Sequence, residues 1–316
     1  MRPAGYTMTM KPHLFLPAVL LLAAVSLGAQ QQVRVTRTRE LPAALRSDKT
    51  VLLSAGEYLV SEVAQSSNPA VSWEQTFDGP QLVITGVSRL TLKALQGRVT
   101  LLAAPRYAYT ILFRQCRDIR LEGLTLGHTE AGECAGGVLR FERCAGVQIQ
   151  GCDLFGSGVV GLDLEESTGI VVRDSTIRDC TYGALYAVEV QDLRLQNVRV
   201  IGNEAWPLVS IDSSRNVVLD SCLLEGNTGD GLLWVSPDSK GVTLPRTTIR
   251  GNEADTLLYE GSLAPDFTET IFLENVFTDE QEDDAEYEDG DGYEAGYDDG
   301  YEEGYNEGYN AALEGE

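Results

Sequence analysis

The sequence predicts an all-β fold, a right-handed parallel β-helix solenoid of about eight coils with an N-terminal helical cap. Two observations predict it. A repeat of 23 to 25 residues runs through most of the chain, and each repeat unit holds three short alternating strands separated by turn residues. Self-similarity at this period is typical of solenoids, in which each unit packs only on its neighbours.

The repeat is clearest when triplets such as Ile119-Arg120-Leu121 are aligned on their last apolar residue. The gaps between successive members are 29, 28, 23, 23, 24, 25 and 29 residues, so the unit carries three insertions. The aligned column consists of Leu92, Leu121, Ile149, Val172, Leu195, Leu219, Leu244 and Leu273. We expect these side chains to point into the core of parallel β-structure.

The content of each unit separates the two folds that have this period. A leucine-rich repeat needs an L-x-x-L-x-L pattern with its asparagine, which the units do not contain. One unit reads instead as strands at 162–164 and 170–172 and a third segment near Ile177. Gly-Asn pairs end the third segment at 202–203, 226–227 and 251–252. Stacked asparagines can hydrogen-bond along the solenoid, so they predict a ladder, with Ser157 and Cys180 replacing asparagine in earlier coils.

A cap precedes the coils, because a solenoid needs its hydrophobic ends covered. Residues 39–46 predict a short amphipathic helix, and residues 51–60 a strand, a turn and a strand. We therefore divide the chain into a signal peptide (1–29), an N-terminal cap with the first strands (30–80), a parallel β-helix (81–277) and an acidic Gly/Tyr-repeat tail (278–316).

The helix followed by Leu-Ser-Ala-Gly-Glu-Tyr at 53–58 resembles the start of the pectate-lyase-like superfamily of right-handed β-helix proteins. The resemblance covers residues 33–277 and implies a secreted bacterial protein with this fold. It also implies that polysaccharide lyases and glycosidases of the superfamily act on the sheet formed by the first strand of each coil. The motifs of the polygalacturonase branch are absent, so the resemblance specifies the fold and not a reaction.

The N-terminus is typical of a secretory signal peptide. Lys11 and His13 precede an apolar run at 14–24, and small residues follow at Ser26, Gly28 and Ala29. Pro17 interrupts the run, which is a poor membrane span. We expect cleavage near Gly28 or Ala29, no membrane span in the mature chain, and a periplasmic, cell-surface or extracellular location.

Charge is concentrated in the tail. The net charge is -24, but residues 278–316 hold 17 Asp and Glu without Lys or Arg, which leaves -7 for residues 1–277. The body shows no basic stripe, so we expect no nucleic-acid partner, and we expect a monomer. Gly every four residues from Gly292 to Gly308, each followed by Tyr, permits a helix, whereas the glycines and the charge favour disorder. Both alternatives stay open.

Six cysteines stand in the chain, and none forms a C-x-x-C pair typical of structural zinc. Alignment places Cys116 and Cys144 in adjacent coils, where buried thiols are favoured slightly over a disulfide. Cys152 and Cys222 share a column but lie three coils apart, too far to bridge. The other two are Cys134 and Cys180.

Candidate site residues lie on the outward side of the first strand of each coil, since side chains alternate in and out. One outward column is Leu112, Arg140, Asp163, Tyr186, Ser210 and Trp234; the column beside it is Arg114, Glu142, Glu165, Val188, Asp212 and Ser236. Aromatic rings stack on sugars, while carboxylates and arginine bond to hydroxyl or uronate groups. We therefore select Asp163, Glu142, Glu165 and His128 as candidate catalytic residues, and Arg140, Tyr186, Trp234 and Asp212 as candidate substrate-binding residues.

The predicted chemistry depends on two placements. His128 lies in an insertion at 127–137 that could overhang this face with Glu130 and Glu133, or could simply lie on the surface. Glu142 should stack over Glu165 at about 5 Å, close enough to raise one carboxyl pKa. Such a pair could act as acid and base or hold a cation such as calcium. The alternative is that these acidic residues solvate the sheet and pair with Arg114 and Arg140.

Three functions follow. The first is a carbohydrate-associated binding or surface-display protein without catalysis. The second is a polysaccharide lyase or glycoside hydrolase acting on an acidic polysaccharide; its lyase route needs an unusually deprotonated arginine. The third is envelope structure or adhesion with no sugar ligand.

Overall fold

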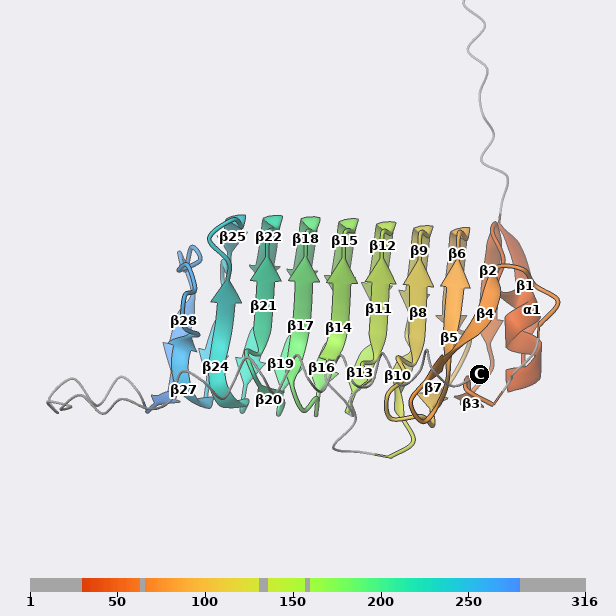
Figure 1. Cartoon of the computed structure of the whole chain (residues 1–316), viewed down its shortest axis with the longest axis horizontal. Helices are drawn as coiled ribbons and strands as arrows, with labels where there is room; N and C mark the ends of the chain where they lie inside the picture. Colours follow the sequence, from red (N-terminus) through yellow and green to blue (C-terminus); the bar gives the residue numbers. More distant parts are fainter. Residues whose placement is uncertain (1–29, 63–65, 131–135, 157–159, 279–316) are drawn as a thin grey trace, which may run out of the picture.

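The computed structural model describes residues 30–62, 66–130, 136–156 and 160–278, and it is a parallel β-helix of about 7 turns (Figure 1). The predicted fold class is confirmed, with slightly fewer coils than expected. The predicted signal peptide, residues 279–316 of the tail, Cys134, Glu133 and Ser157 lie outside the described residues.

Three sheets run the length of the solenoid, and each coil contributes one strand to each sheet. Sheet 1 contains β1 (Gln31–Val35), β2 (Lys49–Leu53), β6 (Ser88–Ala94), β9 (Arg117–Glu122), β12 (Ala145–Gln150), β15 (Thr168–Arg173), β18 (Gln191–Gln196), β22 (Arg215–Asp220) and β25 (Lys240–Thr243). Sheet 2 contains β3 (Gly56–Leu59), β7 (Val99–Ala103), β10 (Thr125–His128), β13 (Asp153–Phe155), β16 (Thr176–Arg178), β19 (Arg199–Ile201), β23 (Leu223–Glu225), β26 (Thr248–Arg250) and β28 (Ile271–Leu273).

Sheet 3 faces the viewer in Figure 1. It contains β4 (Val71–Thr76), β5 (Gly79–Thr85), β8 (Ile111–Arg114), β11 (Leu139–Glu142), β14 (Val160–Glu165), β17 (Gly183–Val188), β21 (Val209–Asp212), β24 (Thr228–Val235), β27 (Glu253–Leu258), β29 (Val276–Phe277) and, paired with β24, β20 (Glu204–Ala205). The strands of all three sheets pair in parallel, except for the hairpin of β4 and β5.

The predicted inward column is confirmed in register and burial. Leu121 pairs with Ile149 and Ile149 with Val172 in sheet 1, and all the members from Leu92 to Leu244 are buried. Leu273 is a correction, because it lies in β28, pairs with Arg250 in sheet 2 and is exposed. Aligning apolar triplets assigned Leu273 to sheet 1, whereas it lies in sheet 2. This wrong assignment explains why the sequence predicted about eight coils rather than about 7.

The N-terminal cap holds a short 3-10 helix η1 (Thr38–Glu40) and a single α-helical turn α1 (Leu41–Ala44). Leu41 and Leu45 are buried against the first coil, so the amphipathic character seen in the sequence serves to cover the core. The helical part is shorter than the predicted segment 39–46 because Pro42 and the residues after Ala44 allow only one turn.

Two of the three corners are tight and regular. Between β14 and β15 only Glu166 and Ser167 intervene; Glu166 has φ 46, and the buried Ser167 accepts a hydrogen bond from the Cys144 backbone N–H at 2.9 Å. The corner between sheets 2 and 3 varies in length, from two residues (226–227) before β24 to ten (129–138) before β11 and eleven (60–70) before β4. Variation in coil length is therefore confined largely to that corner.

The predicted asparagine ladder is confirmed and is longer than expected. Asn203 donates from Nδ2 to Asn227 Oδ1, Asn227 to Asn252 and Asn252 to Asn275, at 2.9, 2.9 and 2.8 Å. Cys180 continues the column, since its backbone N–H donates to Asn203 Oδ1 at 3.0 Å. Asn275 follows Glu274, which has a φ of 53. Glu274 therefore adopts the positive φ that glycine adopts in the three Gly-Asn pairs.

The described cysteines are buried free thiols, as favoured from the sequence. Cys116 and Cys144 stack in adjacent coils, where the Cys116 backbone N–H donates to Cys144 Sγ at 3.4 Å. No helix within the described ranges is long and apolar enough to cross a membrane.

Candidate functional site

The outer face of sheet 3 has the predicted register. Arg140 pairs with Leu112 on one side and Asp163 on the other, and Asp163 pairs in turn with Tyr186. Ser210 lies between Tyr186 and Trp234. In the second column Glu142 lies between Arg114 and Glu165, and Val188 between Glu165 and Asp212. The polar residues expected on one face therefore lie on it.

Ser236 is an exception in the second column. It lies just beyond the end of β24 and is buried, and its hydroxyl accepts the Ser213 backbone N–H at 2.9 Å. It therefore supports a corner of the solenoid and does not face solvent.

Arg140 is the centre of an ion-pair network on this face. Its Nη1 donates to Asp163 Oδ2 at 2.7 Å, its Nε donates to Glu142 Oε1 at 2.8 Å, and its Nη2 donates to Glu165. One guanidinium thus binds carboxylates from its own strand and from the neighbouring strand. The stacking of Glu142 over Glu165 expected from the sequence is present in the register, but Arg140 binds both groups.

Arg114 extends the network toward the hairpin. Its Nε donates to Glu142 Oε2 at 2.6 Å, and its terminal nitrogens donate to Glu74 of β4. Sequence reasoning missed Glu74, because the antiparallel β4–β5 hairpin lies outside the repeat. The alternation of apolar and polar residues at 71–74 and the turn at 77–78 were the available signal. Two arginines and four carboxylates therefore share this part of the face.

Tyr109 closes the network from above and was also missed. Its hydroxyl donates to Asp163 Oδ2, and the Arg140 guanidinium lies over its ring at 5.5 Å. The ring passes directly over Gly137, where an added Cβ would come within 2.4 Å of Tyr109 Cε1. The side chain of Asp163 consequently keeps only 10% of its surface exposed.

The charges on this face are neutralised within it. Partial burial acts to raise the pKa of Glu142, but hydrogen bonds and charge from Arg114 and Arg140 outweigh burial and lower that pKa below its ordinary value. The expectation that like charges raise a carboxyl pKa here is therefore wrong for Glu142. Burial opposes the charge of Arg140, yet Asp163, Tyr109 and Glu142 raise its pKa, so the guanidinium stays protonated.

The placement of His128 is a second correction. It ends strand β10 of sheet 2, keeps 3% of its surface exposed, and bonds through Nε2 to the Ala108 carbonyl at 2.7 Å. Glu130 pairs with Arg106. The structure thus separates His128 from Glu142 and Asp163, because the expected insertion begins after β10 rather than before His128.

An aromatic cluster adjoins the network on the same sheet. Tyr182 and Trp206 lie at the corner before β17 and β21, are 42% and 37% exposed, and meet edge to face with ring centroids 5.4 Å apart. Tyr186 of β17 donates from its hydroxyl to the Tyr182 carbonyl at 3.4 Å. Trp234 lies two strands further along the outward column. Sequence reasoning found Tyr186 and Trp234 but missed the corner pair, because corners were not aligned.

The carboxylates of this face were expected either to hold a cation such as calcium or to pair with arginines. Within the described residues there is no group of three or more His, Cys, Asp or Glu side chains that could hold a metal ion. The carboxylates of the network contact arginines instead.

A family model described as "Right handed beta helix region" matches residues 110–277. The chain belongs to the right-handed β-helix family. The match includes Arg114, Arg140 and the aromatic cluster, whereas Glu74 and Tyr109 of the network precede it. No curated protein matches this β-helix protein.

Among solved structures, a pectate lyase from Paenibacillus sp. 0602 is similar to this β-helix protein with a TM-score of 0.47 and 12% identity, over 76% of this chain and 80% of that chain. An alginate lyase from Paenibacillus sp. str. FPU-7 is similar with a TM-score of 0.42 and 11% identity, over 77% of this chain and 95% of that chain. PfbA, a surface adhesin of Streptococcus pneumoniae, is similar with a TM-score of 0.39 and 10% identity, over 78% of this chain and 79% of that chain.

Proposed function

We propose that the protein is an exported carbohydrate-binding or display protein, and that a sugar chain binds on the aromatic half of sheet 3 without being cleaved. The observation that carries this proposal is the exposed pair Tyr182 and Trp206 beside Tyr186 on a flat, rigid sheet. Aromatic side chains present a large apolar face that suits the planes of sugar rings. Asp212, half-exposed at the far end of β21 on the same face, adds an acceptor for hydroxyl groups.

The ionic half of the face supports binding without catalysis. A glycosidase of the common kind needs a carboxylic acid whose pKa is raised and a second carboxylate free to act on water or on the sugar. Here Glu142 has a lowered pKa, and Asp163 and Glu165 both contact Arg140. A lyase that uses arginine as its base needs that arginine deprotonated, whereas the carboxylates around Arg140 favour its charged form.

The test is a glycan array with the purified chain, followed by titration of each bound glycan and a product assay. Trp206→Ala should weaken binding about tenfold or more, because covering a large apolar side chain contributes roughly 1.5–3 kcal/mol. The matched control is Tyr107→Ala, since Tyr107 is similarly exposed and pairs with Phe77, at 5.1 Å, away from the cluster. This control should bind as the unaltered protein does.

Catalysis would appear as new reducing ends or unsaturated sugars during incubation with a bound glycan. If such products form, and Asp163→Asn abolishes them while leaving affinity intact, the protein is an enzyme and the binding proposal is wrong. If Trp206→Ala and Tyr107→Ala bind every glycan equally, the ligand does not lie on the aromatic cluster.

A further inference from the structure

The outer face of sheet 1 carries arginines that the protein itself does not neutralise. Five successive strands of this sheet, β9, β12, β15, β18 and β22, present five arginines and four carboxylates away from the core. The arginines are Arg117, Arg120, Arg173, Arg194 and Arg215, and the carboxylates are Asp118, Glu122, Asp192 and Asp220.

Three of the four carboxylates already have partners, and among the described residues Asp118 forms no ion pair with an arginine of this face. Asp192 accepts a hydrogen bond from Asn216 Nδ2 at 3.0 Å. Glu122 pairs with Lys93 at 2.7 Å, and Asp220 pairs with Arg246 and, at 3.5 Å, with Arg194. Within the part of the chain that the structure describes, the side chains of the other four arginines form no hydrogen bond or ion pair. On the remaining faces arginines are mostly paired, as in Arg178 with Asp153 and Arg250 with Glu225.

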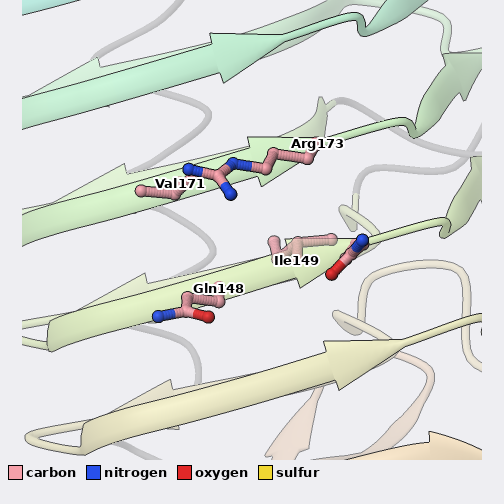
Figure 2. A pocket seen from close by; sticks show the side chains of 5 residues that line it. Gln148, Ile149, Val171 and Arg173 are labelled. Carbon is pink, nitrogen blue, oxygen red and sulfur yellow. The ribbon is translucent and has the colours of Figure 1, made fainter.

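A small hollow lies in the middle of this face (Figure 2). Gln148, Gln150, Val171 and Arg173 line it over Ile149, and its volume is about 80 Å³. Val171 is shorter than its column neighbours Gln148 and Arg194, which leaves the space. Figure 2 shows the Arg173 side chain running back along β15, so that its guanidinium lies beside Val171. The hollow has room for one small polar group and is too small for a sugar ring.

We propose that this arginine face, defined by Arg117, Arg120, Arg173 and Arg215 with Gln148 and Gln150, binds a linear polysaccharide that carries carboxylate or sulfate groups. A guanidinium forms paired hydrogen bonds with such anions. The side-chain amides of Gln148 and Gln150 can donate to and accept from hydroxyl groups between the charges. Strands in the sheet repeat at about 4.8 Å, close to the advance per sugar in an extended chain.

The ligand runs along the solenoid and places successive anionic groups beside successive arginines. Arg120 and Arg173 lie two strands apart, about 10 Å, so they bind charges on sugars that are not adjacent. The carboxylate or sulfate nearest the centre enters the hollow next to Arg173. This site is separate from the aromatic cluster of sheet 3 and does not depend on it.

Charge alone would also suit a nucleic acid, but the side chains on this face favour a polysaccharide. Proteins that hold single strands stack bases on aromatic rings. None of the outward residues on these five described strands is aromatic. The sequence shows no basic stripe because these arginines are spread over nearly 100 residues and only stacking of the coils brings them together.

The experiment titrates the full chain with polygalacturonate, dextran sulfate, uncharged dextran and a single-stranded DNA oligonucleotide. We expect binding of polygalacturonate or dextran sulfate that weakens with salt, and no binding of dextran. Replacing both central arginines, Arg120→Gln with Arg173→Gln, should weaken that binding at least about tenfold, since a hydrogen bond to a charged group contributes roughly 1.5–3 kcal/mol. Because both side chains are exposed and unpaired, the double variant should keep the melting temperature of the unaltered protein.

The matched control is Arg199→Gln, an exposed arginine of β19 on sheet 2 with no side-chain partner among the described residues. It removes a comparable charge from another face and should change affinity less than about twofold. The proposal is overturned if the double variant binds as Arg199→Gln does, if neither anionic polymer binds, or if the oligonucleotide binds more tightly than both. Trp206→Ala should leave this affinity unchanged, so failure here and failure of the sheet 3 proposal are distinguishable.

Discussion

Burial determines what His128 and Asp163 can do. Both were selected as catalytic candidates, and both lie mostly out of solvent. Asp163 is held by Arg140 and covered by Tyr109, while the His128 ring is held by the Ala108 carbonyl. Tyr109 itself has a raised pKa, mainly because it is buried and lies beside the charge of Asp163, so its hydroxyl remains a donor. Each polar group is satisfied within the fold, and the pH response of stability follows from that.

His128 should make the protein less stable as the pH falls. Burial lowers its pKa below the ordinary 6.5, although the Ala108 bond and the charge of Asp78 oppose the shift. The unfolded chain then binds a proton below pH 6.5 more readily than the folded chain. The free energy of unfolding that neutral, buried His128 contributes is complete above pH 6.5. It is lost as the pH falls toward the lower pKa of His128 in the folded chain. His128→Gln keeps a hydrogen-bond donor for the Ala108 carbonyl but does not titrate. Between about pH 7 and about pH 5 the melting temperature of this variant should therefore fall less than that of the unaltered protein.

Glu142 serves as the internal control, because its lowered pKa places its own loss of stability below pH 4.5. Parallel melting curves for His128→Gln and the unaltered protein across pH 7 to 5 would contradict the assignment to His128.

Elements of secondary structure are joined at corners whose buried polar groups need partners. Asn227 shows this clearly, since its Nδ2 donates to Asn252 and to the Val200 carbonyl while its Oδ1 accepts from the Asn203 backbone and side chain. One side chain therefore satisfies groups in three successive coils. The ladder stabilises the stacking of coils rather than any single coil.

Asn227→Ala should lower the free energy of unfolding by about 1–3 kcal/mol or more, because the buried Asn203 backbone N–H loses its acceptor. Asn275→Ala should cost less, since Asn275 ends the described ladder and is only half-buried. Urea denaturation measures both, with Gln196→Ala on the surface of β18 as control. Equal losses for Asn227 and Asn275 would show that the ladder does not act through burial.

The sequence predicted those elements that repeat. Alternation placed the outward columns correctly from Leu112 to Trp234, because two-residue corners keep each coil in register with the next. It failed for Leu273, Ser236 and His128, which stand where a coil ends or changes length. It missed Glu74 and Tyr109 because their contacts with Arg114 and Asp163 cross coils from segments outside the repeat. The local sequence pattern therefore specifies how the coils stack, whereas irregular segments determine which side chains contact one another at the candidate site.

At the scale of the whole molecule, the described chain is a solenoid whose charge is distributed unevenly. Sheet 3 binds its arginines with carboxylates, sheet 1 leaves four arginines unpaired, and the acidic excess of the sequence falls at the C-terminus. The predicted boundaries of signal peptide, cap, solenoid and tail stay predictions. The tail boundary can be tested through stability.

Removing residues 280–316 should leave the melting temperature nearly unchanged in about 0.15 M salt. These residues bring acidic groups without Lys or Arg, and burying unpaired carboxylates against the solenoid would cost more than their tyrosines return. Differential scanning calorimetry of both chains measures the change. A decrease of more than about 5 °C, on the scale of a kcal/mol or two, would show that the tail packs as a cap.

The variable corner between sheets 2 and 3 has a consequence for how such a protein can change over generations. An insertion there leaves the two-residue corners on either side untouched, so every strand keeps its partners while a loop lengthens beside the outer face of sheet 3. Insertions at this corner can therefore lengthen a loop without disrupting strand pairing, and designed loops can be grafted at the same place. The segment 129–138 and the corner that holds Trp206 are examples of longer corners, next to the face on which we propose that a sugar chain binds.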